Sequence, residues 1–214
     1  MSVGERPPLF QATRPNTFWA SVSYAWAGLV HTVVHQRNMR MHMLAAMMVG
    51  FVGTGIPLGL AEKVTMIFCV LLVFFAEVLN SALEHLVDLA VQQFDEKARV
   101  TKNAAAAGVL VLALGTVVIF AAVLVHNVDT IASHGVQIQR QVVLGVPFII
   151  CAGGLMHESP KPIAVDWLFG VVGFLLWVAS LPFSESAVFS AMNFGLWVVT
   201  VAAARERRLT RVTA

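Results

Sequence analysis

Charged residues are scarce in this chain of 214 residues. They make up 12% of the sequence, whereas hydrophobic residues make up 58%. A soluble domain usually carries about a quarter charged residues, because its surface must be hydrated. A core of this size cannot bury so much apolar surface, so we expect lipid to cover the rest. The formal net charge of +2 is too small to indicate a nucleic acid as partner.

Cysteine is also scarce. Cys69 and Cys151 are the two cysteines, and each lies alone within an apolar stretch. The sequence therefore offers neither a disulfide framework nor a cysteine metal site. Residues 1–16 contain no apolar run. We expect them to form an N-terminal cytoplasmic segment rather than a secretory signal.

Long apolar segments dominate the remainder of the sequence. A helix needs roughly 20 apolar residues to cross about 30 Å of hydrocarbon. The segments that meet or approach this length are residues 43–61, 64–92, 104–125, 141–156, 167–183 and 187–204. The sequence thus predicts an all-α integral membrane protein with six spans. Residues 17–36 carry apolar residues at helical spacing, which predicts an amphipathic helix in the headgroup layer or, alternatively, packed on the bundle.

Basic residues are distributed unevenly between the two sides of these spans. If both termini lie in the cytoplasm, 12 of the 14 Lys and Arg residues fall in cytoplasmic segments. The two others, Lys63 and Arg140, lie in outer loops. This asymmetry follows the positive-inside rule and predicts that both ends are cytoplasmic.

The second predicted span carries a line of polar residues. The line consists of Glu77, Asn80, Glu84 and Asp88, which share about 80° of arc on one helix face. Acids at membrane depth are costly and are therefore functional candidates. Glu84 and Asp88 lie nearer the cytoplasm, where they can meet a hydrated cation. Glu77 lies deeper and is suited to accept a proton.

Basic residues follow this span at the start of the next helix, where phosphate oxygens bind readily: Lys97, Arg99 and Lys102. Carboxylates for Mg²⁺, a deep base and a lysine together indicate phosphoryl transfer to a hydroxyl at the membrane surface. Two alternatives stay open. The polar line can serve only to hold helices together, or it can form a proton or cation path. The second is disfavoured because the later spans have no charged residue in their interiors.

Four motifs within residues 17–125 together resemble the prokaryotic diacylglycerol kinase and undecaprenol kinase family. The most specific is the pattern Glu-x-x-Asn-Ser-Ala-x-Glu-x-x-x-Asp, which begins at Glu77. The others are Tyr-Ala-Trp-Ala-Gly-Leu from Tyr24, Arg-Asn-Met-Arg-Met-His from Arg37, and Lys-Asn-Ala-Ala-Ala-Ala-Gly from Lys102. Residues 17–125 are thus interpreted as a lipid-kinase-like domain.

The resemblance implies a homotrimer in the bacterial inner membrane, with ATP and Mg²⁺ bound at the cytoplasmic face in composite sites between subunits. The reaction would phosphorylate a membrane lipid alcohol, either undecaprenol or diacylglycerol. Carried over by position, Glu77 would be the general base and Glu84 a metal ligand. The residues expected to bind ATP or substrate are Asn80, Asp88, Lys102, Asn103 and Tyr24.

Two amides stand where the family pattern has acids. Gln36 occupies the position of an acidic metal ligand directly before Arg37, and Asn103 occupies that of an aspartate after Lys102. An amide oxygen binds Mg²⁺ but lacks the charge that helps to hold a hard cation. We therefore expect Gln36 to be a weaker metal ligand. We also keep a second hypothesis, in which the chain is a non-catalytic or altered-activity member of the fold that binds a lipid or a partner.

Residues 126–214 form a C-terminal transmembrane extension beyond the resemblance, without a catalytic signature. Glu158 and Asp166 lie at span ends and are interpreted as hydrated loop residues, and the basic segment 205–211 suits anionic headgroups. The extension can pack around the core, contact a partner or shape lipid access. The nearby histidines of the first domain are interpreted as interfacial residues: His31, His35 and His42.

Overall fold

The computed structural model describes residues 17–213, and the segment predicted for residues 1–16 lies outside the described residues. The all-α prediction is confirmed, because the regular elements of the described part are eight α-helices and one 3-10 helix. In chain order they are α1 (Phe18–His35), α2 (Arg37–Thr54), α3 (Leu60–Ala90), α4 (Glu96–His126), α5 (Val128–Ser133), α6 (Gly135–Met156), α7 (Ile163–Ser180), η1 (Leu181–Phe183) and α8 (Ala187–Thr213).

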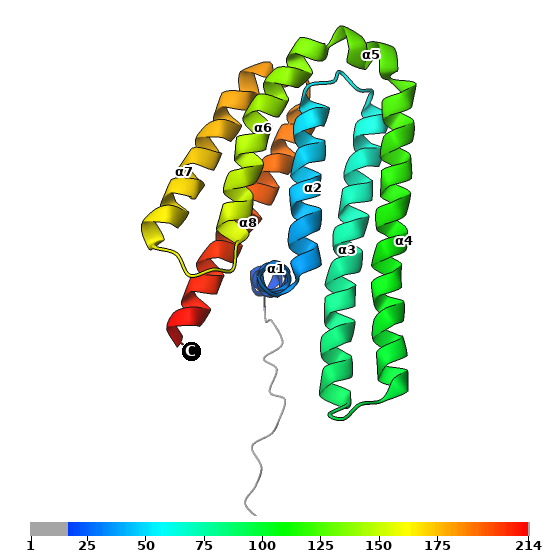
Figure 1. Ribbon diagram of the computed structural model, residues 1–214, viewed down its shortest axis with the longest axis vertical. Coiled ribbons are helices and arrows are strands. Elements are labelled where there is room, and N and C mark those ends of the chain that lie inside the picture. The colour runs from blue at the N-terminus through cyan, green and yellow to red at the C-terminus, as the bar shows by residue number, and fades with distance from the viewer. Residues whose placement is uncertain (1–16, 214) are drawn as a thin grey trace, which may run out of the picture.

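The first two helices meet at a sharp change of direction. The hydroxyl of Thr17 accepts a hydrogen bond from the main-chain N–H of Ala20 (3.2 Å) and caps the start of α1. Gln36 has extended backbone angles (φ −98°, ψ 114°) and separates α1 from α2. Consequently α1 lies across one end of the bundle, whereas α2 runs along it (Figure 1). We call this end, which also carries the α3–α4 and α6–α7 links, the α1 end.

The described part of the chain contains five helices that are long and apolar enough to cross a membrane. They are α3, α4, α6, α7 with η1, and α8. The protein is therefore a multi-pass membrane protein, with one fewer candidate span than the six predicted. The difference lies in α2, which begins six residues before the predicted segment 43–61 and ends before Pro57. Its first turns contain Arg37 and Arg40, which lower the mean hydropathy.

Helices α3 and α4 form a long antiparallel hairpin (Figure 1). The apolar segment predicted for residues 104–125 reaches almost to the end of α4 but misses its first turns, because α4 begins at Glu96. Asp95 Oδ1 accepts hydrogen bonds from the main-chain N–H groups of Lys97 (2.7 Å) and Ala98 (3.1 Å). This cap stabilises two further polar turns of α4 and places Lys102 beside the end of α3.

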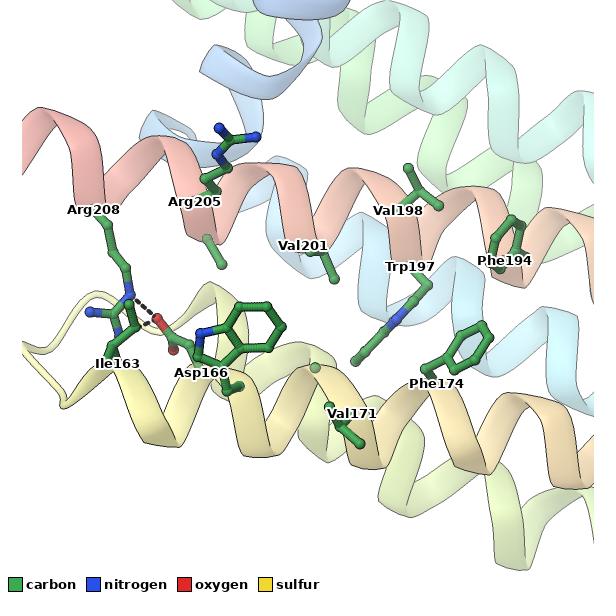
Figure 2. Close-up of a pocket in the computed structure, with 13 residues that line it drawn as sticks. Ile163, Asp166, Val171, Phe174, Phe194, Trp197, Val198, Val201, Arg205 and Arg208 are labelled. Carbon is green, nitrogen blue, oxygen red and sulfur yellow. Dashed lines mark hydrogen bonds and ion pairs between the residues drawn. The ribbon is translucent and has the colours of Figure 1, made fainter.

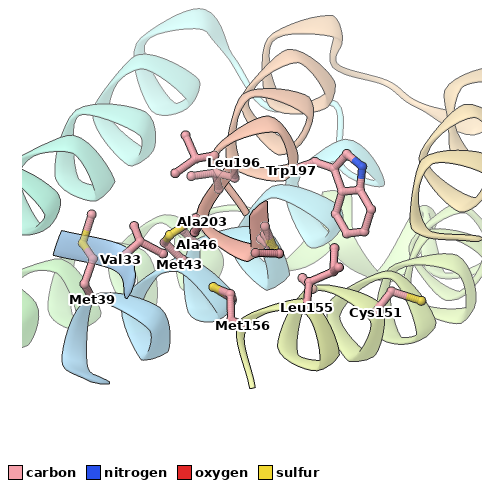
Figure 3. Packing of buried hydrophobic residues seen from close by; sticks show 14 of the residues in the cluster. Val33, Met39, Met43, Ala46, Cys151, Leu155, Met156, Leu196, Trp197 and Ala203 are labelled. Carbon is pink, nitrogen blue, oxygen red and sulfur yellow. The ribbon is translucent and has the colours of Figure 1, made fainter. Parts of the chain in front are cut away.

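The main hydrophobic core joins the predicted kinase-like domain to the C-terminal extension (Figure 3). It draws side chains from α1, α2, α6 and α8, including Val33, Met43, Phe148, Trp197 and Ala203. Close approach requires small residues at these contacts. A Cβ atom at Gly53 would lie 2.6 Å from the ring of Phe189 on α8. The extension is thus packed directly against α1 and α2 rather than forming a separate body.

Arg207 of α8 binds the end of α6. The residue is 9% exposed, and its guanidinium donates hydrogen bonds to the carbonyl oxygens of Met156 (2.6 Å) and His157 (2.7 Å), and also to that of Leu155. These carbonyls belong to the last turn of a helix, where no N–H within the helix is available to them. Arg207 therefore both caps α6 and attaches it to α8.

Ion pairs connect the loops at the α1 end. Glu158 pairs with Arg40 of α2, and this guanidinium holds the pKa of the Glu158 carboxyl below its usual range. Asp166 pairs with Lys161 (2.9 Å) and Arg208. The interpretation of Glu158 and Asp166 as merely hydrated loop residues is therefore corrected, because Glu158 pairs with α2 and Asp166 joins α7 to α8 within the extension.

Candidate active site

One face of α3 turns a row of polar side chains toward the junction of α1 and α2. Positions 77, 80, 81 and 84 recur at three- and four-residue spacing, so they share a helix face. Glu77, Asn80 and Ser81 are buried, with 1%, 5% and 3% of their surface exposed. Glu84, nearer the α1 end, is partly exposed. The row thus runs from a dry interior toward solvent.

Gln36 and two residues of α3 gather around Glu84. The side-chain amide of Gln36 donates hydrogen bonds to Glu84 Oε2 (3.2 Å) and to the Ser81 hydroxyl (3.3 Å). The amide of Asn80 donates to Glu84 Oε1 (2.9 Å). We call these four residues the Glu84 cluster. The structure therefore brings together three of the predicted site residues, Gln36, Asn80 and Glu84.

Glu77 lies two helical turns deeper and contacts His42 of α2. The distance between His42 Nε2 and Glu77 Oε1 is 3.3 Å, and the His42 side chain is 27% exposed. The contact does not have hydrogen-bond geometry, so Glu77 Oε1 is a buried oxygen without a hydrogen bond. The interpretation of His42 as an interfacial residue missed this contact, because the sequence does not reveal how α2 is aligned against α3.

Lys102 joins the polar row through Asp88. The two side chains form an ion pair between α4 and α3. The Lys102 side chain is 36% exposed and that of Asp88 is 63% exposed. Asp88 is one helical turn, about 6 Å, from Glu84 along α3. The lysine therefore lies at the open end of the polar row, although no hydrogen bond joins it to the Glu84 cluster within the described residues.

Two predicted site residues lie apart from the others in a single chain. Tyr24 is 55% exposed, and Asn103 is also exposed. Between residues 17 and 213, no hydrogen bond connects either side chain to the Glu84 cluster. Their predicted contacts with ATP or substrate therefore stay predictions.

A group of three histidines lies beside the site, and only two of them were considered from the sequence. The rings of His31 and His35 are stacked with centroids 4.1 Å apart, and the ring of His85 meets that of His31 at 5.7 Å. Burial lowers the pKa of His31, and the charges of His35 and His85 lower it further, whereas Glu206 opposes the shift. His85 follows Glu84 directly, so this histidine cluster couples α1 and α3 next to the site.

Few protein oxygens near Glu84 are available to bind a metal ion. No three His, Cys, Asp or Glu side chains group around a metal position in the described part of the chain. The oxygens near Glu84 are its carboxylate, the amide oxygen of Gln36 and Asn80 Oδ1, which is buried without a hydrogen bond. Mg²⁺ commonly takes one or two carboxylates together with water and phosphate oxygens. The chemistry of these oxygens is compatible with such an ion if water or ligand oxygens complete its coordination.

The first half of the chain is similar in sequence to known proteins. The profile of the family described as prokaryotic diacylglycerol kinase matches residues 23–124. A diacylglycerol kinase of Synechocystis sp. is 35% identical over 100 residues, which are 46% of this chain and 57% of that protein. An undecaprenol kinase of Bacillus subtilis is 33% identical over 99 residues, which are 46% of this chain and 80% of that protein. No solved structure shows a significant match.

Proposed function

Because the chain belongs to the prokaryotic diacylglycerol kinase family, we propose that it phosphorylates the hydroxyl of a membrane lipid alcohol with ATP and Mg²⁺ at the α1 end. The names of the two relatives make diacylglycerol and undecaprenol the candidate substrates. The chain spans only 57% of the length of the Synechocystis relative, and the support for the activity comes from the residues of this site.

The observation that carries this proposal is the buried carboxylate of Glu77, which has an oxygen without a hydrogen bond on the same face as the Glu84 cluster. Glu77 would remove the proton of the lipid hydroxyl. At the same time the hydroxyl oxygen would form a bond to the γ-phosphorus, and the bond from this phosphorus to ADP would break. Seven residues separate Glu77 from Glu84, which is about 10 Å along α3. This spacing leaves room for a hydroxyl and a phosphate between the base and the metal ligand.

The other residues of the site would bind and orient the reactants. Glu84 would hold Mg²⁺ together with the amide oxygens of Gln36 and Asn80, and the bound ion would neutralise charge on the phosphates. Lys102 is partly exposed and would exchange Asp88 for phosphate oxygens. Glu77 would keep its position through the contact with His42, which makes His42 a positioning residue.

We propose the same homotrimer and orientation that the sequence predicts, with both termini in the cytoplasm and the bundle in the bacterial inner membrane. The uneven distribution of Lys and Arg supports the orientation. The exposure of Tyr24 and Asn103 supports composite sites, because neither side chain reaches the Glu84 cluster of its own chain by a hydrogen bond within the described range. Both would then contact the nucleotide of a neighbouring subunit.

Transfer of labelled γ-phosphate to diacylglycerol and to undecaprenol in mixed micelles tests the proposal. We expect wild-type protein to label at least one alcohol. Glu77→Gln should lower kcat by about 10²- to 10⁴-fold, the usual contribution of a general base. Glu185→Gln is the matched control, because Glu185 is exposed and lies outside the site. Wild-type kcat in Glu77→Gln would exclude Glu77 as the base.

A second candidate function is favoured by Gln36. This residue donates an amide hydrogen bond to Glu84, where an acid would add a second negative charge for a metal. A non-catalytic member of the family that binds a lipid or a partner protein would tolerate this loss. Wild-type protein that labels neither alcohol and gains no thermal stability from millimolar Mg-ATP would support this second function over the first.

A further inference from the structure

An elongated groove lies between α7 and α8, within the C-terminal extension (Figure 2). Its volume is about 690 Å³, within the usual range of sites for small molecules. Aromatic side chains form much of its walls, namely Trp167 and Phe174 from α7 and Phe194 and Trp197 from α8. Aliphatic residues and Gly170 complete this part of the lining. The body of the groove is therefore apolar.

One end of the groove is charged. Asp166, Arg205 and Arg208 line it, and Figure 2 shows Arg208 joined to Asp166. Lys161 also pairs with Asp166 (2.9 Å). Lys161 and Arg208 thus share one acid, and Arg205 adds a third cation on α8, with its side chain pointing away from Asp166 in Figure 2. Arg205 is exposed and has no ion pair within the described part of the chain, so it is available to an anion.

The length of the groove corresponds to one leaflet of a bilayer. Phe194 and Arg208 are 14 residues apart on α8, or about 21 Å at about 1.5 Å per residue. Half of a bilayer, with its headgroups, is about 20 to 22 Å thick. The charged end lies at the α1 end, beside the α6–α7 link. An anionic group at Arg205 would therefore lie at headgroup depth, with the aromatic wall beside the hydrocarbon chains.

We propose that this groove binds one phospholipid with a net negative headgroup, taken from the leaflet at the α1 end. The phosphate would contact the exposed guanidinium of Arg205, and an acyl chain would lie along the wall formed by Trp167 and Trp197. Basic sites between membrane helices bind anionic headgroups through the same charge complementarity. No residue of the Glu84 cluster lines the groove, so this site is independent of the proposed phosphoryl transfer.

Quenching of tryptophan fluorescence by lipids with brominated acyl chains tests the site, because Trp167 and Trp197 line it. The full chain in detergent is titrated with brominated phosphatidylglycerol and, separately, with brominated phosphatidylcholine. We expect saturable quenching at a lower mole fraction of the anionic lipid. Arg205→Gln should weaken the binding of phosphatidylglycerol by about fivefold, the effect of one basic residue near a lipid surface, and leave that of phosphatidylcholine unchanged.

A second variant tests the apolar body of the groove. A Cβ atom at Gly170 would meet no atom within 4 Å, so the side chain of Gly170→Leu can occupy the groove without disturbing the packing. We expect it to abolish saturable quenching by both lipids. Gly195→Leu is the control, because Gly195 on α8 is equally unobstructed but does not line the groove.

Three results would overturn the proposal. Equal affinity of wild-type protein for the two lipids would remove the role of the charged end. Wild-type quenching in Gly170→Leu would place the lipid elsewhere. A change in oligomeric mass caused by Gly170→Leu, with lipid quenching intact, would show that a second copy of the chain fills the groove. Thermal unfolding of each variant verifies that the protein is folded, and the labelling of lipid alcohols serves as a separate measure of the proposed kinase activity.

Discussion

Replacing Gln36 by glutamate is the most direct perturbation of the Glu84 cluster. The amide nitrogen of Gln36 lies 3.2 Å from Glu84 Oε2. A glutamate at this position with the same side-chain conformation would replace an attractive hydrogen bond by two adjacent carboxylates. We expect Gln36→Glu to destabilise the protein when no divalent cation is present, and Mg²⁺ to reverse this effect.

The size of the effect follows from the separation of the charges. Two unit charges about 4 Å apart near a protein surface interact by about 4 kcal/mol. Glu84 is partly exposed, so screening by solvent reduces this repulsion. We therefore expect the free energy of unfolding to fall by about 2 kcal/mol, which for a chain of this size lowers Tm by about 4 to 8 °C. A cation bound between the two carboxylates would cancel the repulsion and restore Tm.

Thermal unfolding of the detergent-solubilised protein, with EDTA or with millimolar Mg²⁺, measures this difference. Gln93→Glu adds the same charge in the exposed α3–α4 link and serves as the control. The wild type and the control should respond weakly to Mg²⁺. If Gln36→Glu unfolds at the wild-type temperature in EDTA, or if Mg²⁺ does not raise its Tm, the side chain at position 36 does not face Glu84 and the metal assignment is wrong.

Three further predictions concern the packing of the bundle. Arg207→Met should lower the free energy of unfolding by about 2 to 4 kcal/mol in denaturant titrations, because buried carbonyls of α6 lose a charged donor; an unchanged midpoint would contradict the cap. Because the pKa of His31 is lowered in the folded protein, the unfolded state binds the proton of His31 more readily, and the free energy of unfolding should decline as pH falls below 6.5. Tm measurements from pH 7.5 to 5.5 should show a smaller decline in His31→Gln. Gly53→Ala should lower the free energy of unfolding by about 1 to 3 kcal/mol, because the new methyl group would overlap with Phe189. Gly28→Ala, whose Cβ meets no atom within 4 Å, should be neutral or stabilising. Equal effects of the two variants would contradict the close approach of α2 and α8.

Much of the fold could be predicted because hydropathy and polar spacing are local properties. The predicted apolar segments each overlap most of one helix among α3, α4, α6, α7 and α8. The spacing of Glu77, Asn80 and Glu84 places them on one helix face. Helix ends were less predictable, because caps such as Asp95 extend α4 into polar sequence that hydropathy does not detect. The short helix α5 lies in a stretch without a strong apolar signal.

Contacts between distant segments could not be predicted from one sequence. Spacing along α3 does not determine which residue of α2 faces Glu77, so the partner His42 was missed. The pairing of Arg40 with Glu158 likewise depends on the docking of the extension against α2. The motif residues Gln36, Asn80 and Glu84 do meet, because two of them share a helix and the third occupies the break before α2.

The shared core of α1 and α8 has a consequence for biosynthesis. Val33 and Ala203 belong to one hydrophobic cluster although 170 positions separate them along the chain. During translation, the packing surface of α1 is incomplete until α8 has left the ribosome and entered the bilayer. Domains generally fold from the N-terminus as they are made. Here the region around Gln36 is fully packed only after α8 has been made, so nascent chains halted before α8 would hold an unfinished site.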